Sequence, residues 1–75
     1  MAKNILNMIL WHPEMETERC KLTYVHRSRR ENLKTIKGSS IDRLERGFLI
    51  LDEGTQIPFH RIVKIEYDDR IIWIK

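Results

Sequence analysis

The stretch FLILDEGTQIPFHRIVKIEYDDRIIWI, residues 48–74, indicates the fold more clearly than any other part of the chain. It opens with a short apolar run at 48–51, which predicts a strand. Asp-Glu-Gly at 52–54 is typical of a hairpin loop, because glycine adopts the left-handed conformation without steric cost. The return strand begins at Thr55, and Pro58 either interrupts it or places it at a sheet edge.

The second half of this stretch alternates between apolar and polar residues. Over residues 61–67, one face of an extended chain carries Val63, Ile65 and Tyr67. The opposite face begins with Ile62. Residues 68–70 form a turn, and a last strand at 71–74 follows. The pattern predicts an antiparallel meander.

The chain before this stretch begins with a helical period. Apolar residues recur on one stripe of residues 2–12, and Pro13 ends the predicted helix by forcing its neighbour out of the α region. Residues 14–19 form a connection. Residues 20–27 are predicted to form a strand whose one face carries Cys20, Leu22, Tyr24 and His26. A polar loop at 28–32 leads to a short edge strand at 33–37.

Residues 38–46 allow two interpretations. Gly38, Ser39 and Ser40 are turn residues, and the two serines can cap a short helical turn over 41–46 that stops at Gly47. An extended segment over 41–46 agrees with the sequence almost as well.

Together these elements predict an α+β domain. We expect an N-terminal helix packed on a curled antiparallel sheet, or on a half-open barrel, of four to five short strands. The 75 residues are enough for one domain, residues 1–75, with a thin core.

Composition predicts a protein of a reducing compartment. Cys20 is the single cysteine, so no disulfide forms within the chain. No apolar run approaches the roughly 18 residues that a membrane span needs, and no signal peptide is visible, so we expect a cytoplasmic protein that does not bind membranes. Abundant charged residues with few amide side chains favour a thermophilic source.

Positive charge is concentrated in one segment. The chain carries a net charge of +3, yet residues 19–37 hold seven basic residues and one acidic residue. Such clustering is typical of proteins that bind a polyanion. The alternative is a solvated loop that only keeps the protein soluble.

Two His-Arg pairs are the most specific candidate site: His26-Arg27 and His60-Arg61. On an extended backbone, the two residues of each pair project from opposite faces. If the two strand ends converge, the pairs surround one anion, where arginine binds phosphate oxygens bidentately and histidine adds a donor. The alternatives are a buried, satisfied His26 and an Arg61 that pairs with an acidic residue, Glu66 or Asp68.

Other chemistries have weaker signals. Two histidines, such as His26 and His60, can act as general base and general acid in the cleavage of a phosphodiester. The tandem His-x-Thr/Ser motif of such enzymes is incomplete in this chain. The three histidines and Cys20 are dispersed, and phosphate-binding glycine motifs are absent. We therefore predict a protein that is not an enzyme, with no catalytic residue, metal or cofactor.

Aromatic residues next to these pairs are candidates for stacking on unpaired bases. Phe59 precedes His60-Arg61, and Tyr24 precedes His26-Arg27. Core packing is the stronger interpretation for Tyr24 and Trp73, whereas both interpretations stay open for Phe59.

Five motifs along the chain resemble those of a small, uncharacterised archaeal family. They are Leu6 to Trp11, Tyr24 to Arg27, Phe48 to Gly54, Ile57 to Ile65, and Ile72-Trp73. The domain of that family is labelled an RNA cyclic group end recognition domain, and it also occurs fused to RNA-processing domains. The resemblance implies binding of RNA ends that carry a 2′,3′-cyclic phosphate. By position it favours Tyr24, His26, Arg27, His60 and Arg61.

We therefore predict an RNA-binding module that recognises a phosphate-bearing RNA end in RNA processing or repair, with RNA-processing proteins as possible partners. The predicted binding residues are Tyr24, His26, Arg27, Arg29, Arg30, Lys34, Phe59, His60 and Arg61. One alternative is a phosphoesterase that uses His26 and His60. Another is a protein-interaction domain that docks through Phe59 or Trp11.

Overall fold

The structure is a computed structural model that describes residues 2–26 and 32–75. Within these residues, one α-helix precedes seven strands and three short 3-10 turns. The helical elements are α1 (Ala2–Trp11), η1 (Thr17–Arg19), η2 (Gly38–Ser40) and η3 (Phe59–Arg61). The strands are β1 (Cys20–Val25), β2 (Leu33–Lys37), β3 (Ile41–Glu45), β4 (Phe48–Leu51), β5 (Gln56–Pro58), β6 (Ile62–Tyr67) and β7 (Arg70–Ile74).

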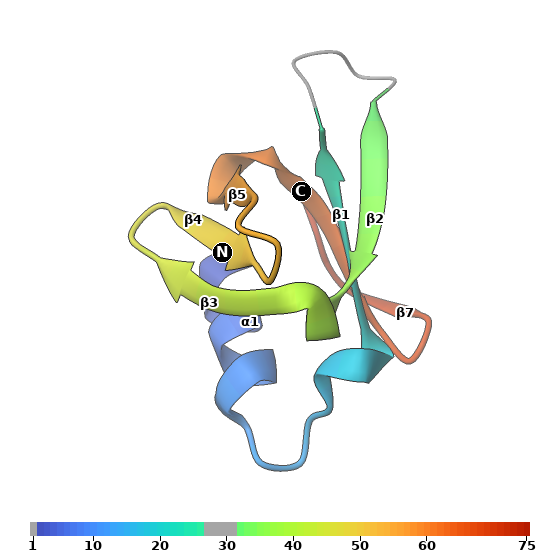
Figure 1. Cartoon of the computed structure of the whole chain (residues 1–75). Coiled ribbons are helices and arrows are strands. Elements are labelled where there is room, and N and C mark those ends of the chain that lie inside the picture. The colour runs from blue at the N-terminus through green and yellow to red at the C-terminus, as the bar shows by residue number, and fades with distance from the viewer. Residues whose placement is uncertain (1, 27–31) are drawn as a thin grey trace.

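The strands form two antiparallel sheets, as Figure 1 shows. The larger has the order β2-β1-β6-β7, and the smaller has the order β3-β4-β5. The predicted α+β class is confirmed, and the sheets do not close into a barrel. The predicted number of four to five strands was too low, because the chain leaves one sheet at η2 and begins the second with β3. Pro58 ends the edge strand β5, where its missing N–H costs no ladder hydrogen bond.

The helical alternative for residues 41–46 was wrong, and the extended one was right. Residues 41–45 form β3, which pairs with β4 so that Ile41 lies opposite Leu51. Gly47 does not stop a helix but occupies the β3–β4 turn with φ 89°. Pairing with β4 satisfies the backbone polar groups of this segment, a contribution that a local reading of the sequence does not contain.

A β-bulge changes the predicted faces of β6. Tyr24 pairs with Ile62 and Thr23 pairs with Lys64, so Val63 is an extra residue on β6. Simple alternation placed Ile62 and Ile65 on opposite faces. Because the bulge interrupts the alternation between them, both are fully buried in the core, at 0% exposure.

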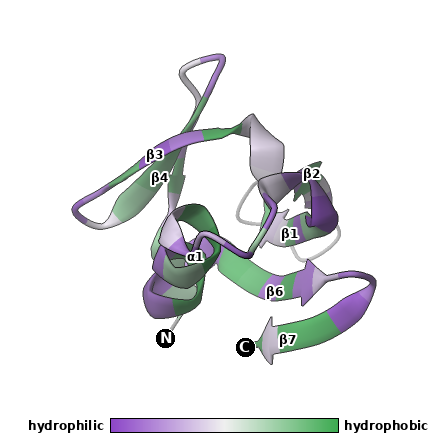
Figure 2. Cartoon of the chain, turned by 90° about the horizontal axis from the view of Figure 1, so that it is seen from below, coloured by the Kyte–Doolittle hydropathy of each residue, from purple (hydrophilic) through white to green (hydrophobic). Residues whose placement is uncertain are grey.

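The core lies where α1 meets both sheets. In Figure 2, α1 runs between the side of the molecule that holds β3 and β4 and the side that holds β6 and β7. The largest fully buried side chains come from the helix and from both sheets: Leu6, Ile9, Leu22, Leu49, Ile57, Ile62, Ile65 and Cys20. None of the helices in the described ranges is long and apolar enough to cross a membrane.

Candidate functional site

The C-terminal end of β1 presents an aromatic ring and an imidazole together. Tyr24 and His26 are two residues apart, so their side chains project from one face. Their ring centroids lie 6.2 Å apart with the planes at 64°, an edge-to-face contact. Tyr24 is buried whereas His26 is exposed, so the alternative of a buried His26 was wrong. The imidazole therefore rests on a buried ring and remains open to solvent.

His60 and Arg61 lie on η3 rather than on an extended strand. Successive side chains of a 3-10 turn project about 120° apart, so the two residues do not point to opposite faces as predicted. Two hydrogen bonds hold this turn: the Phe59 N–H donates to the Gly47 carbonyl at 3.1 Å, and the Lys75 ammonium donates to the His60 carbonyl at 2.6 Å.

One small pocket brings part of the predicted site together. His26 and Arg61, 35 positions apart in the sequence, both line a cavity of about 90 Å³. Its other lining residues are Tyr24, Thr55, Gln56, Ile57 and Pro58. Residues with guanidinium, imidazole, hydroxyl and amide side chains thus line the cavity, and none of the described residues that line it is acidic. Thr55 and Gln56 were not predicted as site residues; their polar side chains on the return strand of the hairpin were the available signal.

Glu66 and Asp68, the acidic residues considered as partners of Arg61, pair with other basic residues. Arg19 Nε donates to Asp68 Oδ1 at 2.6 Å, and Lys64 lies 3.5 Å from Glu66. Among the described residues, no carboxylate lies within ion-pair distance of Arg61. Its guanidinium is therefore not neutralised by this part of the chain.

Two cations of the basic segment are neutralised at the other end of β1. The hydrogen bond to Asp68 raises the pKa of Arg19, and the hydrogen bond to Asp69, at 2.9 Å, raises the pKa of Lys21. Arg19 also lies over the ring of Tyr67, 5.7 Å from its centroid. These two cations contribute to the β6–β7 turn rather than to the candidate site.

The remaining predicted residues fall in different places. Lys34 is exposed on β2 directly opposite Tyr24, close to the His26 end of β1. Arg27, Arg29 and Arg30 lie outside the described residues.

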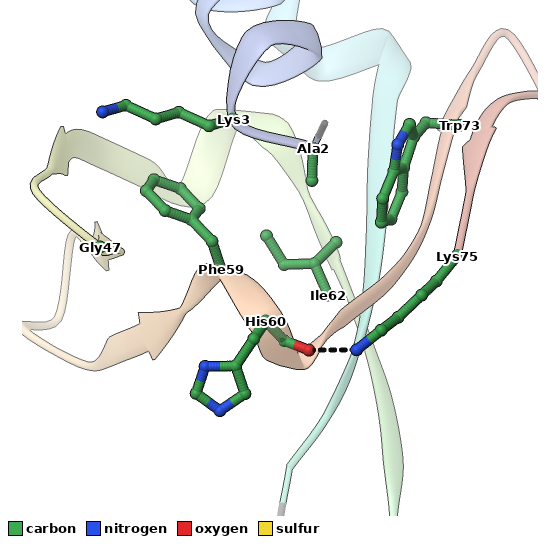
Figure 3. Close-up of a pocket in the computed structure, with 8 residues that line it drawn as sticks. All are labelled: Ala2, Lys3, Gly47, Phe59, His60, Ile62, Trp73 and Lys75. Carbon is green, nitrogen blue, oxygen red and sulfur yellow. Dashed lines mark hydrogen bonds between the residues drawn. The ribbon is translucent and has the colours of Figure 1, made fainter.

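Phe59 and His60 line a second and larger cavity, shown in Figure 3. Its volume is about 480 Å³. The other lining residues are Ala2, Lys3, Gly47, Ile62, Trp73 and Lys75. The sequence analysis assigned Trp73 to the core, and the structure leaves it half-buried at this cavity.

The two histidines of the candidate site do not share a cavity: His26 lines the smaller one and His60 the larger one. Within residues 2–26 and 32–75, no group of three histidine, cysteine or acidic side chains is placed to hold a metal ion.

The chain is similar to archaeal proteins named UPF0248. It is 41% identical over 66 residues to such a protein from Methanocaldococcus jannaschii, an alignment that covers 87% of this chain and 79% of the relative. A relative from Methanococcus maripaludis strain C7 is 40% identical over 65 residues, covering 87% of this chain and 83% of the relative. A relative from Archaeoglobus fulgidus is 32% identical over 63 residues, covering 84% and 88%.

A protein-family model covers the whole chain. The model that matches residues 1–75 is described as the MJ1316 RNA cyclic group end recognition domain. No solved structure matches the chain significantly.

Proposed function

Because this chain belongs to the family of the MJ1316 RNA cyclic group end recognition domain, we propose that it is an RNA-binding module for phosphate-bearing RNA ends. The ends in question include 2′,3′-cyclic phosphates formed in RNA processing or repair. The observation that carries the proposal is the cavity that His26 and Arg61 both line, where the lining residues within 2–26 and 32–75 include no acidic one.

The chemistry of this cavity suits the phosphate of an RNA end. Arg61 offers a planar fork of donors that matches two phosphate oxygens. His26 adds a ring N–H, and Tyr24 restrains the imidazole from the core side. Thr55 and Gln56, which also line the cavity, offer neutral donors. A volume of about 90 Å³ suits a single phosphate group rather than a whole nucleotide.

We propose that long-range attraction comes from the exposed Lys34 and from other cations of the basic segment. Lys34 lies opposite Tyr24 in the sheet, and Arg27 follows His26 in the sequence. Arg29 and Arg30, which belong to the same basic segment, are proposed to add sequence-independent attraction. Affinity is then expected to fall with salt, by a slope of about −0.7 per phosphate neutralised on single-stranded RNA.

Binding agrees better with the geometry than hydrolysis does. A two-histidine mechanism needs a general acid and a general base on either side of one phosphorus. His26 and His60 line separate cavities. We therefore propose recognition without cleavage.

One observation favours a second candidate function, a protein-interaction domain. Trp11, at the end of α1, is 79% exposed, and tryptophan is enriched at the energetic centres of protein interfaces. If this surface is the functional one, neutralising the basic residues leaves partner binding unchanged, whereas Trp11→Ala abolishes it.

The first experiment compares one short labelled RNA with three different 3′ ends by fluorescence anisotropy. The ends are a 2′,3′-cyclic phosphate, a 3′-phosphate and a 3′-hydroxyl, each at low and physiological salt. We expect tighter binding of the phosphate-bearing ends, and we expect Arg61→Ala to remove that preference.

Arg70→Ala is the matched control, because it removes the same charge from the opposite end of the sheet, at the β6–β7 turn. It is expected to keep the preference. Equal affinity for all three ends in the unmodified protein would contradict end recognition, and salt-independent affinity would contradict phosphate binding altogether.

A further inference from the structure

The larger cavity, which Arg61 does not line, has the form of a site for a flat aromatic group. Phe59 and Trp73 are both half-buried and contact the hydrophobic core. In Figure 3, their rings lie on opposite sides of Ala2 and Ile62. Ala2 and Ile62 are 5% and 0% exposed, so they provide an apolar floor. Two aromatic walls above an apolar floor favour a planar ring that stacks on them.

The polar groups at this cavity are basic. Lys3, His60 and Lys75 line it, and the part of the chain that the structure describes contributes no acidic side chain to its lining. Lys3 extends from the start of α1 past Phe59 in Figure 3. The Lys75 ammonium is anchored on the His60 carbonyl at 2.6 Å, which fixes a positive charge below the Trp73 ring. This charge complements an aromatic group that carries phosphates rather than a neutral or basic peptide.

Two consecutive residues of η3 each line one of the two cavities. His60 lines the larger one and Arg61 the smaller one, and consecutive Cα atoms are about 3.8 Å apart. The base and the phosphate of one nucleotide are likewise separated by a single sugar. A nucleotide can therefore pass over η3 with its phosphate at Arg61 and its base on the side of Phe59.

We propose that the cavity between Phe59 and Trp73 binds the nucleobase of the nucleotide whose phosphate lies at Arg61. This inference rests on the proposed function and assigns to it a stacking site for the terminal base. Its volume of about 480 Å³ lies within the usual range of small-ligand pockets and accommodates a purine or a pyrimidine. Two sources present this chemistry, the last nucleotide of an RNA and a free cyclic mononucleotide.

Tryptophan emission provides a direct test, because the chain has only two tryptophans. Trp11 is 79% exposed, so Trp11→Phe is expected to fold normally and to leave Trp73 as the single emitter. Binding of an RNA that ends in a base and a cyclic phosphate is expected to quench this emission. The Trp73→Phe variant, which keeps only Trp11, is the matched control and is expected to show no quenching.

Affinity provides the second readout. The same RNA is compared with one whose terminal nucleotide carries the cyclic phosphate but lacks the base. Stacking of one base on an aromatic side chain corresponds to a loss of about 5- to 100-fold when the base is missing. Trp73→Leu, which keeps an apolar side chain, is expected to lower affinity for the complete RNA by a similar factor. Phe59→Leu tests the opposite wall if Trp73→Leu fails to fold.

The outcomes separate this inference from the proposed function. Preference for phosphate ends with equal affinity for complete and abasic RNA, and without quenching of Trp73, overturns the base site alone. No preference for phosphate ends in any protein variant overturns the proposed function as well. Quenching by a free 2′,3′-cyclic mononucleotide supports the base site and identifies one nucleotide as sufficient. Quenching by the RNA but not by the free mononucleotide supports a base site that is specific for RNA termini.

Discussion

His60 and Arg61 are consecutive residues that line two different cavities. The 3-10 turn η3 separates them, and Lys75 and Gly47 hold that turn through its backbone. Arg61 thereby joins His26 at the end of β1, whereas His60 joins Phe59 and Trp73. The position of η3 therefore decides which residues line the proposed phosphate site and which line the proposed base site.

The two histidines are expected to respond differently to substitution. His26→Ala removes a donor from the smaller cavity and is expected to lower the preference for phosphate ends by about tenfold, the usual effect of losing a hydrogen bond to a charged group. His60→Ala is expected to keep that preference, because His60 does not line the smaller cavity. Fluorescence anisotropy with RNAs that end in a phosphate or in a hydroxyl measures the end preference of both variants. Equal loss in the two variants would instead favour the two-histidine phosphoesterase, which is then tested by product analysis.

Gly38→Ala is expected to destabilise the protein by about 1–3 kcal/mol, the usual cost of overpacking a filled site. A Cβ atom at Gly38 would lie 2.7 Å from the Thr17 carbonyl oxygen and 2.9 Å from the Cys20 Cβ. Neither atom is the end of a flexible side chain, so the backbone must move. Urea unfolding measures the change. Ser39→Ala, at the exposed neighbour, is the control and is expected to change stability by less than about 0.5 kcal/mol.

The β6–β7 turn is expected to tolerate Asp69→Asn better than Asp69→Ala. Asp68 and Asp69 have φ angles of 53° and 63°, a left-handed conformation that asparagine adopts readily and alanine does not. Both variants lose the exposed ion pair with Lys21, which high salt screens. Thermal unfolding in high salt is therefore expected to place Asp69→Asn near the unmodified protein and Asp69→Ala below it. Equal melting temperatures of the two variants would contradict the explanation that the left-handed backbone conformation at position 69 causes the difference in stability.

Cys20 is expected to make stability depend on pH above neutrality. Burial raises the pKa of its thiol from 9.0 to about 11. A raised pKa means that the folded state holds the proton more tightly, so this contribution is complete below pH 9 and is lost as pH rises towards about 11. Cys20→Ala lacks the titrating group. The difference in unfolding free energy between the unmodified protein and Cys20→Ala is expected to shrink over this interval. If the unfolding free energies of the two proteins changed in parallel with pH, the pKa of the Cys20 thiol would not be raised by folding.

The elements that could be predicted from the sequence are those whose causes are local. Pro13 lies just beyond α1, Gly54 takes a positive φ of 95° in the β4–β5 turn, and Asp68-Asp69 turn the chain back between β6 and β7. Alternation correctly placed Cys20 and Tyr24 on the buried face of β1. Each of these signals acts through steric limits or side-chain periods within a few residues, so no distant partner is needed to interpret it.

Part of the candidate site could also be predicted. Tyr24, His26 and Arg61 were selected from the sequence, and the structure brings them to one cavity. The assignment relied on residue type and resemblance, which carry no information about position in space. Consequently Thr55 and Gln56, which complete that cavity, were missed.

The sequence by itself determined the fold class, the helix, the turns and the chemistry available to a phosphate. Only the tertiary structure decided the bulge at Val63, the strand at 41–45, the assignment of His60 and Arg61 to different cavities and the placement of Trp73 at the cavity that Phe59 lines. All four depend on pairing or packing between segments that are distant in the chain. Such contacts satisfy backbone groups and bury apolar surface only after the sheets have formed, so no local pattern records them.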